Sequence, residues 1–467
     1  MNARKPSRHR AIADDLRTGI GSGTYPTGSR LPSLRSLARI HGAGLNTVAA
    51  ALRLLQTEGL VTALPRSGFR VIQAPRLPTA DPDAPRDIAD VVLRAWRNRE
   101  VPGMVVLSNC ILPPELSPVS CLQAQARTAM EKGIGLACAY VGMPGYPPLR
   151  QAIARHLRSL GAHVDADDIL ITNGAMEAVH LALRSTCRPG ALVAIESPCY
   201  AAHLLTLDDL DLRPLPIVVH PDLGLDCEAL AECVRNEQVA AVLCSPVHAN
   251  PHGGCLSDAS RRQLLDLCHR HRIPIIEDDA NGELSHQHPR LPPLLADDRH
   301  GTVLHAGSLT KTLGAGLQLG FLVTGAHMAS ASRHKVACNL SAGALPQVLA
   351  NELLSCPELP RLQARIGATL AERMRHCRDT VLAHFPAGSQ VSQPSGGTAL
   401  WIRMPPEVDG ARLYADGIRS GVRANPGTLY GADHRHALRI ATGHWSTGIE
   451  RAIAQLGRLA CHQLRSG

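Results

Sequence analysis

The sequence predicts an α/β protein in which a small basic helical module precedes a large sheet-containing domain. Several short apolar runs, each typical of a buried strand, end in small or polar residues, and helical patterns begin there. Charge is concentrated at one end of the chain. Residues 1–76 contain twelve Lys and Arg but only three acidic residues, a net charge of +9, whereas the whole chain has +8. The rest of the chain is therefore close to neutral.

The basic module has the pattern of three helices followed by a β-hairpin. Ser33 can cap a short second helix, and Asn46 can cap the third. The apolar positions at helical spacing are Ile12, Leu16 and Ile20 in the first helix and Val48, Ala51, Leu52 and Leu55 in the third. This order predicts a winged helix-turn-helix, whose third helix has the size to enter a major groove. The net charge of +9 is typical of a module that binds a phosphate backbone.

The motifs of this module resemble the DNA-binding domain of the GntR regulators. The resemblance rests on segments 31–38, 46–48 and 58–60. It implies contacts with double-stranded operator DNA from Arg30, Ser33, Arg35, Asn46, Thr47, Arg66 and Gly68. Leu45 stands where the family has an arginine, which removes one expected DNA contact. A basic helical dimerisation domain is the alternative that the pattern leaves open.

The larger part of the chain predicts strands whose ends present groups for a cofactor. The apolar runs lie at 169–172, 193–196, 240–244, 274–276 and 302–305. The first leads to Gly174, Ala175 and Met176, a turn that opens a helix and can cradle a phosphate with backbone N–H groups. The last leads through Ser308 to Lys311. A lysine beside small residues and hydroxyls at a strand end suits a Schiff base with an aldehyde cofactor.

Three further side chains at strand ends suit the ring of such a cofactor. Asp278 follows the run 274–276 and can pair with a protonated pyridine nitrogen, the partner that makes pyridoxal phosphate an electron sink. Asn250 can donate to the phenolic oxygen, and Tyr200 can stack on the ring. Each side chain alone has an ordinary structural explanation, but the ordered set points to one site.

In this order and spacing, the segments resemble the fold-type I aminotransferase family over roughly residues 105–460. The resemblance implies a mostly parallel sheet flanked by helices, with a smaller C-terminal α+β subdomain. It implies pyridoxal 5'-phosphate as cofactor, with Lys311 as the catalytic Schiff-base lysine. The implied cofactor-binding positions are Gly174, Ala175, Met176, Tyr200, Asn250, Asp278, Ser308, Lys311, Tyr140 and Gln318. Arg439 is implied to hold the carboxylate of a substrate or effector.

Two positions of the large domain depart from the family pattern. Gln318 stands seven residues after Lys311, where the family has a phosphate-binding arginine. The stretch 280–281 replaces a tyrosine that hydrogen-bonds the phenolic oxygen. Because a guanidinium binds phosphate more strongly than an amide does, the affinity for the cofactor should be lowered.

A GntR-type winged helix in front of an aminotransferase-like domain is the layout of the MocR-type regulators, which the chain resembles. The expected boundaries are 1–75 for the DNA-binding domain, 76–105 for a linker and 106–460 for the cofactor domain, with a large part at about 130–335 and a small part at about 345–460. The expected function is transcription regulation, in which the large domain senses pyridoxal phosphate or an amine or amino acid condensed onto it. The expected assembly is a homodimer, in which Tyr140 reaches across.

Two alternatives to this function remain open at the level of the sequence. The first is a pyridoxal-phosphate-dependent aminotransferase with a residual DNA-binding domain, and the second is a regulator that has lost the cofactor. No apolar run approaches the roughly 18 residues that span a membrane, and residues 1–10 lack the apolar segment of a secretory signal. The 14 cysteines include no C-x-x-C pair, so we expect no metal site and a reducing cytoplasmic location.

Overall fold

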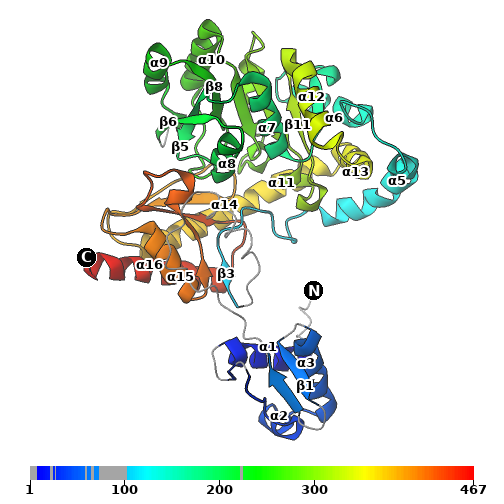
Figure 1. Cartoon of the computed structure of the whole chain (residues 1–467), viewed down its shortest axis with the longest axis vertical. Coiled ribbons are helices and arrows are strands. Elements are labelled where there is room, and N and C mark those ends of the chain that lie inside the picture. Colours follow the sequence, from blue (N-terminus) through cyan, green and yellow to red (C-terminus); the bar gives the residue numbers. More distant parts are fainter. Residues whose placement is uncertain are drawn as a thin grey trace. The chain divides into compact units, whose positions relative to one another are not determined.

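A computed structural model describes residues 8–21, 25–26, 28–57, 60–64, 68–72, 103–220 and 224–466. The chain forms two units, which are described separately below (Figure 1). Most of the expected linker 76–105 and the expected DNA contact Arg66 lie outside the described residues.

The N-terminal unit is built as the helical pattern predicts. Its elements are α1 (Arg8–Gly21), α2 (Leu34–Ile40), α3 (Leu45–Thr57), β1 (Val61–Leu64) and β2 (Gly68–Val71). The two strands pair antiparallel, and both α1 and α2 pack against α3. The predicted apolar residues form its core, each at most 4% exposed: Ile12, Leu16, Ile20, Val48, Ala51, Leu52 and Leu55. The predicted winged helix-turn-helix is confirmed.

The two predicted helix caps have different outcomes. Ser33 caps α2 as predicted, because its hydroxyl accepts a hydrogen bond of 3.2 Å from the backbone N–H of Ser36. The prediction that Asn46 caps the third helix is wrong. The carbonyl of Gly44 already accepts from the backbone N–H of Val48 at 3.2 Å, so Asn46 lies inside the first turn of α3.

The larger unit is organised around an eight-stranded sheet of order β4-β11-β10-β9-β8-β5-β6-β7. The strands are β4 (Ile169–Thr172), β5 (Leu192–Ser197), β6 (Arg213–His220), β7 (Gly224–Leu225), β8 (Val239–Cys244), β9 (Ile275–Asp279), β10 (Val303–Ser308) and β11 (Gly320–Val323). The pairs along β10-β9-β8-β5-β6 are parallel, whereas β11 runs antiparallel to both of its neighbours. The expected mostly parallel sheet is confirmed.

Helices cover both faces of this sheet, so its strands are apolar on both sides. Ile169 and Ile171 pack into one cluster with residues of α6 (Pro147–Ser159) and α14 (Leu359–His384). Leu170 faces the opposite cluster, which contains residues of α7 (Ala175–Thr186). Burial on both faces explains why the strands appear as continuous apolar runs in the sequence. The other helices of this part are α5 (Val119–Ala137), α8 (Ala201–Asp209), α9 (Cys227–Asn236), α10 (Asp258–His271), α11 (Thr310–Leu313), α12 (Met328–Asn339) and α13 (Ala344–Leu354).

A second, four-stranded antiparallel sheet lies in the C-terminal part of the chain, with the order β12-β13-β16-β15. Its strands are β12 (Gln390–Val391), β13 (Ala399–Arg403), β15 (Asn425–Pro426) and β16 (Ala437–Ala441). The remaining elements are α15 (Gly410–Arg419), α16 (Thr447–Ser466) and the short pair β3 (Val105–Val106) and β14 (Val422–Arg423). Among the described residues, no helix has both the length and the apolar character needed to cross a membrane.

Candidate cofactor site and DNA-binding surface

The carboxyl ends of parallel strands bring three of the predicted cofactor residues to one edge of the large sheet. Asp278 lies near the end of β9, in register with Ala306 of β10. Lys311 lies in α11, which begins two residues after β10, and Asn250 lies in the loop that follows β8. Strand order therefore gathers residues that are far apart in the sequence.

The amine of Lys311 and the guanidinium of Arg439 contact the same short segment of the chain. Lys311 Nζ donates to the carbonyl of Cys110 at 2.8 Å, and Arg439 Nη2 donates to the carbonyl of Ser108. Arg439 Nη1 also donates to Asn250 Oδ1 at 3.3 Å, which leaves the amide protons of Asn250 for another acceptor. A cavity of about 50 Å³ lies beside Lys311. The expected effector residue and the expected Schiff-base lysine thus both bond to the segment 108–110.

The carboxylate of Asp278 lies beside His203, a residue that the sequence does not single out, and it accepts from the backbone N–H of Ala280 at 3.0 Å. His203 Nε2 lies 3.0 Å from Asp278 Oδ2, and the pair is almost fully buried. The ring of Tyr200 meets the His203 ring edge-on, at 5.4 Å between centroids and an angle of 88°. Tyr200 immediately precedes α8 and His203 lies in its first turn, so this spacing is the signal that could have revealed the pair.

Glu196 is a buried glutamate near Asp278, and its pKa is strongly raised. Burial raises the pKa of Glu196 to about 8, and the nearby negative charge of Asp278 adds to the rise. The backbone N–H of Ser245 donates to Glu196 Oε2 at 3.1 Å, and this hydrogen bond opposes the rise in pKa. Near neutral pH this carboxyl is therefore mainly protonated, and the site around Asp278 carries less negative charge than its composition indicates.

The turn before α7 has the geometry of an anion cradle. Gly174 has a φ of +83° at the N-cap, and no side chain of the described residues caps the helix there. Gly320 lies against this turn, because a Cβ on it would stand 2.5 Å from the carbonyl carbon of Gly174 and 2.7 Å from Ala175 N. Only glycine permits such an approach. The side chains of Ala175 and Met176 carry no hydrogen-bond donor, so the cradle consists of backbone N–H groups.

An ion pair fixes the first turn of α7. Lys335 is fully buried, and its Nζ donates to Glu177 Oε2 at 2.8 Å. The same oxygen accepts from the backbone N–H of Asn173 at 2.5 Å. A carboxylate near a helix N-terminus is electrostatically favourable, and here it also closes the turn that Gly174 begins. This pair was not predicted from the sequence, because Lys335 lies far from the strand ends.

Two of the predicted cofactor-binding residues, Gln318 and Tyr140, make no hydrogen bond with the other site residues in this chain as far as it is described. Gln318 has a φ of +50°, and its Nε2 donates to the carbonyl of Ala315 at 3.0 Å, inside its own loop. Tyr140 is 82% exposed and makes no hydrogen bond within the described part of the chain. Ser308 is well placed, since its Oγ accepts from the backbone N–H of Thr310 at 3.2 Å and keeps its own proton to donate.

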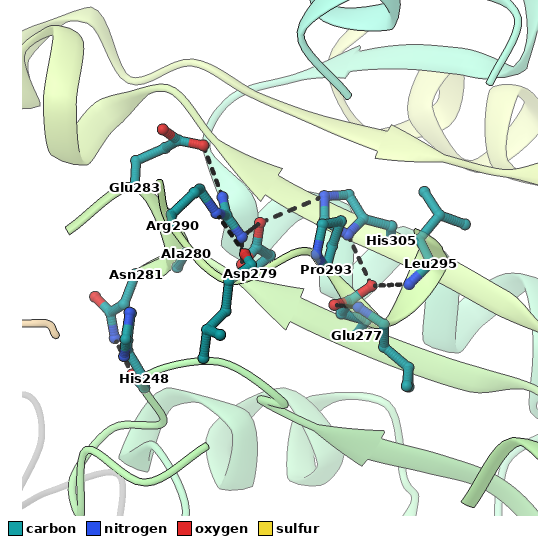
Figure 2. Close-up of polar contacts among 12 residues, drawn as sticks. His248, Glu277, Asp279, Ala280, Asn281, Glu283, Arg290, Pro293, Leu295 and His305 are labelled. Atoms are coloured by element: carbon teal, nitrogen blue, oxygen red, sulfur yellow. Dashed lines mark hydrogen bonds and ion pairs between the residues drawn. The ribbon is translucent and has the colours of Figure 1, made fainter. Parts of the chain in front are cut away.

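The stretch that replaces the expected tyrosine makes a different contact. Asn281 Nδ2 donates to the carbonyl of His248 at 3.0 Å, as Figure 2 shows. His248 belongs to the loop that carries Asn250. An amide at position 281 therefore ties this loop to the end of β9, but it does not supply the hydroxyl that the family pattern has.

On the face of β9 opposite to Asp278, ionisable side chains form a buried network (Figure 2). Arg290 Nη2 donates to both carboxylate oxygens of Asp279 at 2.9 Å, and its Nη1 donates to Glu283 Oε1 at 2.7 Å. His305 Nδ1 lies 2.9 Å from Glu277 Oε2, and both side chains are inaccessible to solvent. Burial opposes protonation of His305, but the charge of Glu277 prevails and raises its pKa. None of these partners could be assigned from sequence spacing.

The predicted DNA-binding residues gather at the starts of two helices and at the hairpin. Arg35 is exposed in the first turn of α2, and Asn46 is exposed in the first turn of α3, where Thr47 is half-buried. Arg30 is exposed, and its backbone pairs with that of Arg70 in a single antiparallel β-bridge. Of the other predicted contacts, Ser33 is the cap of α2 and Gly68 opens β2 with a φ of +88°.

Comparison with known proteins finds two family matches along the chain. Residues 116–456 match the family "Aminotransferase class I and II", and residues 8–71 match "Bacterial regulatory proteins, gntR family". The HTH-type transcriptional regulator YjiR of Escherichia coli is 30% identical over 97% of this chain and 98% of its own length. YdcR of the same organism, also an HTH-type transcriptional regulator, is 29% identical over 98% and 100%.

The chain belongs to the HTH-type regulators that join a gntR-family module to an aminotransferase class I and II domain. The resemblance stated from the sequence is thereby confirmed. Among solved structures, LysN, an α-aminoadipate aminotransferase from Thermus thermophilus, superposes with a TM-score of 0.75. That likeness covers 81% of this chain and 98% of LysN at 24% identity, and it shows the shared fold.

The buried network of this regulator's aminotransferase fold gives a stability prediction. Arg290→Met should lower the free energy of unfolding by about 3–5 kcal/mol, because Asp279 and Glu283 would stay buried without their guanidinium. Urea unfolding followed by circular dichroism measures this loss. Arg261→Met is the matched control, because Asp297, the carboxylate partner of Arg261, is 47% exposed and can be rehydrated. Equal losses in the two variants would contradict the prediction.

The same network gives the sign of a pH effect. Burial opposes ionisation of Glu283, but bonds from His156 and Arg290 lower its pKa to about 2. Since an ordinary glutamate has a pKa of about 4.3, the stabilisation from this carboxylate is complete above that pH and is lost as the pH falls toward 2. The difference between wild type and Arg290→Met should shrink over the same range.

Proposed function

We propose that this chain is a DNA-binding transcriptional regulator whose large unit binds pyridoxal 5'-phosphate and responds to it or to an amino compound. The observation that carries the proposal is the pairing of two features in one chain. The winged helix exposes Arg35 and the start of α3, and the large unit brings Lys311, Asp278 and Asn250 to one edge of its sheet. A basic module of net charge +9 suits an operator-binding protein and has no evident use in a metabolic enzyme.

The residues of the large unit fit the ring and the aldehyde of this cofactor. Asp278 is held by the backbone N–H of Ala280, lies 3.0 Å from His203 and suits a protonated pyridine nitrogen. Asn250 can direct its amide protons toward the phenolic oxygen, because the bond from Arg439 orients its Oδ1. Lys311 supplies the amine that would attach the aldehyde. When bound, the cofactor would withdraw electrons from an attached amine, and Arg439 would orient a carboxylate on that amine.

The phosphate would be held more weakly than the ring. Backbone N–H groups at Gly174 and Ala175 and the hydroxyl of Ser308 suit it, but Gln318 contributes no charge and is bonded to Ala315. A regulator benefits from modest affinity, because its occupancy then follows the cellular concentration of the ligand. The weak phosphate site therefore supports sensing over catalysis.

Restoring the missing charge should tighten cofactor binding. Gln318→Arg should lower the dissociation constant for pyridoxal 5'-phosphate by roughly 5- to 30-fold, because a charge-assisted bond contributes about 1–2 kcal/mol more than a neutral one. An absorbance titration of the apoprotein measures the constant. Gln318→Met serves as control and should leave the affinity nearly unchanged, since the wild-type amide is engaged by Ala315. No gain with arginine would mean that another group already neutralises the phosphate.

We also propose that the regulator is a homodimer in the cytoplasm, where operator DNA lies. Helix α5 exposes Val119, Met130 and Ile134, which are large apolar residues at 44–54% exposure. Tyr140 follows this helix and is also exposed, which suits a role in the partner's site. Two winged helices in a dimer would address two operator half-sites.

The regulator proposal is tested by DNA binding of the full-length protein. Binding isotherms with the gene's own upstream region and with a scrambled duplex should differ, and both affinities should fall steeply as salt rises. Adding pyridoxal 5'-phosphate, alone and with amino acids, should change the affinity for the upstream region. Equal or salt-insensitive binding to both duplexes would refute the proposal.

A metabolic aminotransferase is the second candidate, and one observation favours it. The chain retains Lys311, Asp278, Asn250 and Arg439 together, which a protein that only binds DNA does not need. Sustained transfer of amino groups between amino acids and 2-oxo acids, together with failure to bind DNA, would favour this second function.

A further inference from the structure

The large unit contains a second cavity of about 330 Å³, which shares only Ser308 with the residues proposed for the cofactor site. Its wall is formed by parts of α6, the start of α14 and the short turn Gly282–Leu284. Ser308 and Thr312, which flank Lys311 in the sequence, also line it, whereas Lys311 itself does not. A volume of this size is in the range of small-molecule sites.

The strand β9 separates this cavity from the cofactor site. Successive residues of a strand point to opposite faces, so Asp278 and Asp279 serve different sites. Asp278 Oδ2 lies 3.0 Å from His203 Nε2, whereas Asp279 accepts hydrogen bonds from Arg290 and lines the cavity. The two sites are thus back to back across one strand.

The polar wall of the cavity has an excess of negative charge. Besides the Cys356 thiol, its titratable groups are Asp279, Glu283, Arg290 and His156. One guanidinium serves both carboxylates, as Figure 2 shows for Arg290 between Asp279 and Glu283. The wall thus contains two carboxylates and one permanent cation, and His156 Nε2 lies 2.8 Å from Glu283 Oε1. In the adjoining pair, the charge of Glu277 raises the pKa of His305, which favours an ion pair without net charge.

The neutral side chains that line the cavity indicate what else a ligand of this cavity would need. Gln363 Nε2 donates to Glu283 Oε2 at 3.3 Å, and its amide oxygen has no hydrogen-bond partner among the described residues. That oxygen is an acceptor near the carboxylate of Glu283. The lining also includes the apolar side chains of Leu157, Leu309 and Phe321. A cation with a compact apolar body matches both kinds of lining.

We propose that this cavity binds an organic ammonium ion, with its charge beside Glu283 and Gln363 and its apolar body against Leu157 and Phe321. The site differs from the cofactor site in that no covalent bond to Lys311 is needed. Because Ser308 and Thr312 flank Lys311, such a ligand would also change cofactor affinity. That last consequence rests on the proposed function, but the binding itself does not.

The test uses N-methylpiperidine, a tertiary amine that is cationic at neutral pH and cannot condense with an aldehyde. Calorimetry with the full-length wild type should show saturable binding at millimolar concentration or below. N-acetylpiperidine has a similar shape but no charge, and it should not bind. Lys311→Ala should bind the amine as wild type does, which separates this proposal from the fate of the cofactor proposal.

A matched pair of charge variants localises the site. Gln363→Lys places an ammonium beside Glu283 and should weaken binding of N-methylpiperidine at least tenfold, whereas Gln363→Glu should tighten it several-fold. Gln151→Lys makes the same charge change at an exposed position of α6 and should leave binding unchanged.

Four outcomes would overturn the proposal: no binding by wild type, equal binding of the neutral analogue, unchanged affinity in Gln363→Lys, or loss of binding in Lys311→Ala. The last would place the amine at the cofactor site.

Discussion

Replacing Lys311 with alanine is expected to abolish covalent attachment of pyridoxal 5'-phosphate. The wild type should show the absorbance of lysine-bound cofactor, and borohydride should trap the cofactor on one lysine. Lys311 is the expected residue because it follows β10 at the edge of the sheet, and its Nζ donates at 2.8 Å to the carbonyl of Cys110, two residues from the carbonyl that Arg439 contacts. Peptide mass mapping after reduction identifies the modified lysine.

Two control variants separate the covalent role of Lys311 from its charge. Lys311→Arg keeps a cation that can donate to Cys110, yet it should trap no cofactor. Lys132→Ala removes an exposed lysine that pairs with Glu352 at 3.0 Å, and it should trap as wild type does. If Lys311→Ala keeps the band and traps equally well, the assignment of Lys311 is wrong.

Arg35→Ala is expected to weaken operator binding by roughly 5- to 150-fold, which corresponds to about 1–3 kcal/mol for a bidentate base contact. Arg35 is exposed in the first turn of α2, close in sequence to the Ser33 cap that orients this turn. Fluorescence anisotropy with the upstream duplex measures the loss. Affinity for scrambled DNA should change much less, since base contacts carry specificity and phosphate contacts do not.

Two further variants distinguish base contacts from phosphate contacts. Arg53 is exposed in the later turns of α3, so Arg53→Ala should weaken binding to both duplexes equally and reduce the salt slope by about one. Leu45 is 50% exposed at the first position of α3, and Leu45→Arg should strengthen binding. If Arg35→Ala behaves like Arg53→Ala, Arg35 binds a phosphate and does not read a base.

Local patterns predicted most of the elements because their causes are local. The stripe of Val48, Ala51, Leu52 and Leu55 predicted α3, because only a helix places these four on one face. The five apolar runs predicted five strands of the sheet, since a strand buried on both faces is apolar throughout. The ends of these elements do not follow from the apolar pattern. Strand β9 extends through Asp279, so the carboxylates expected after the strand lie within it.

The sequence predicts single residues of the site but not the contacts between them. Asp278 and Asp279 are adjacent and chemically identical, and the pleat of β9 sends one to His203 and the other to Arg290. The sequence does not show which faces the cofactor until the strand's neighbours are known. His203 and Arg290 carry no motif of their own. Their roles come from contacts between segments that the order of strands brings together.

By itself, the sequence determined the winged helix, the strand-end position of Lys311 and the charge difference between the two parts of the chain. These depend on periodicity, composition and the order of residues along the chain. The tertiary structure alone decided that the amide of Gln318 turns to Ala315, that Asn46 lies inside α3, and that Lys335 pairs with Glu177. Such contacts depend on where a side chain can find a partner across space, and that is set by packing of the whole unit.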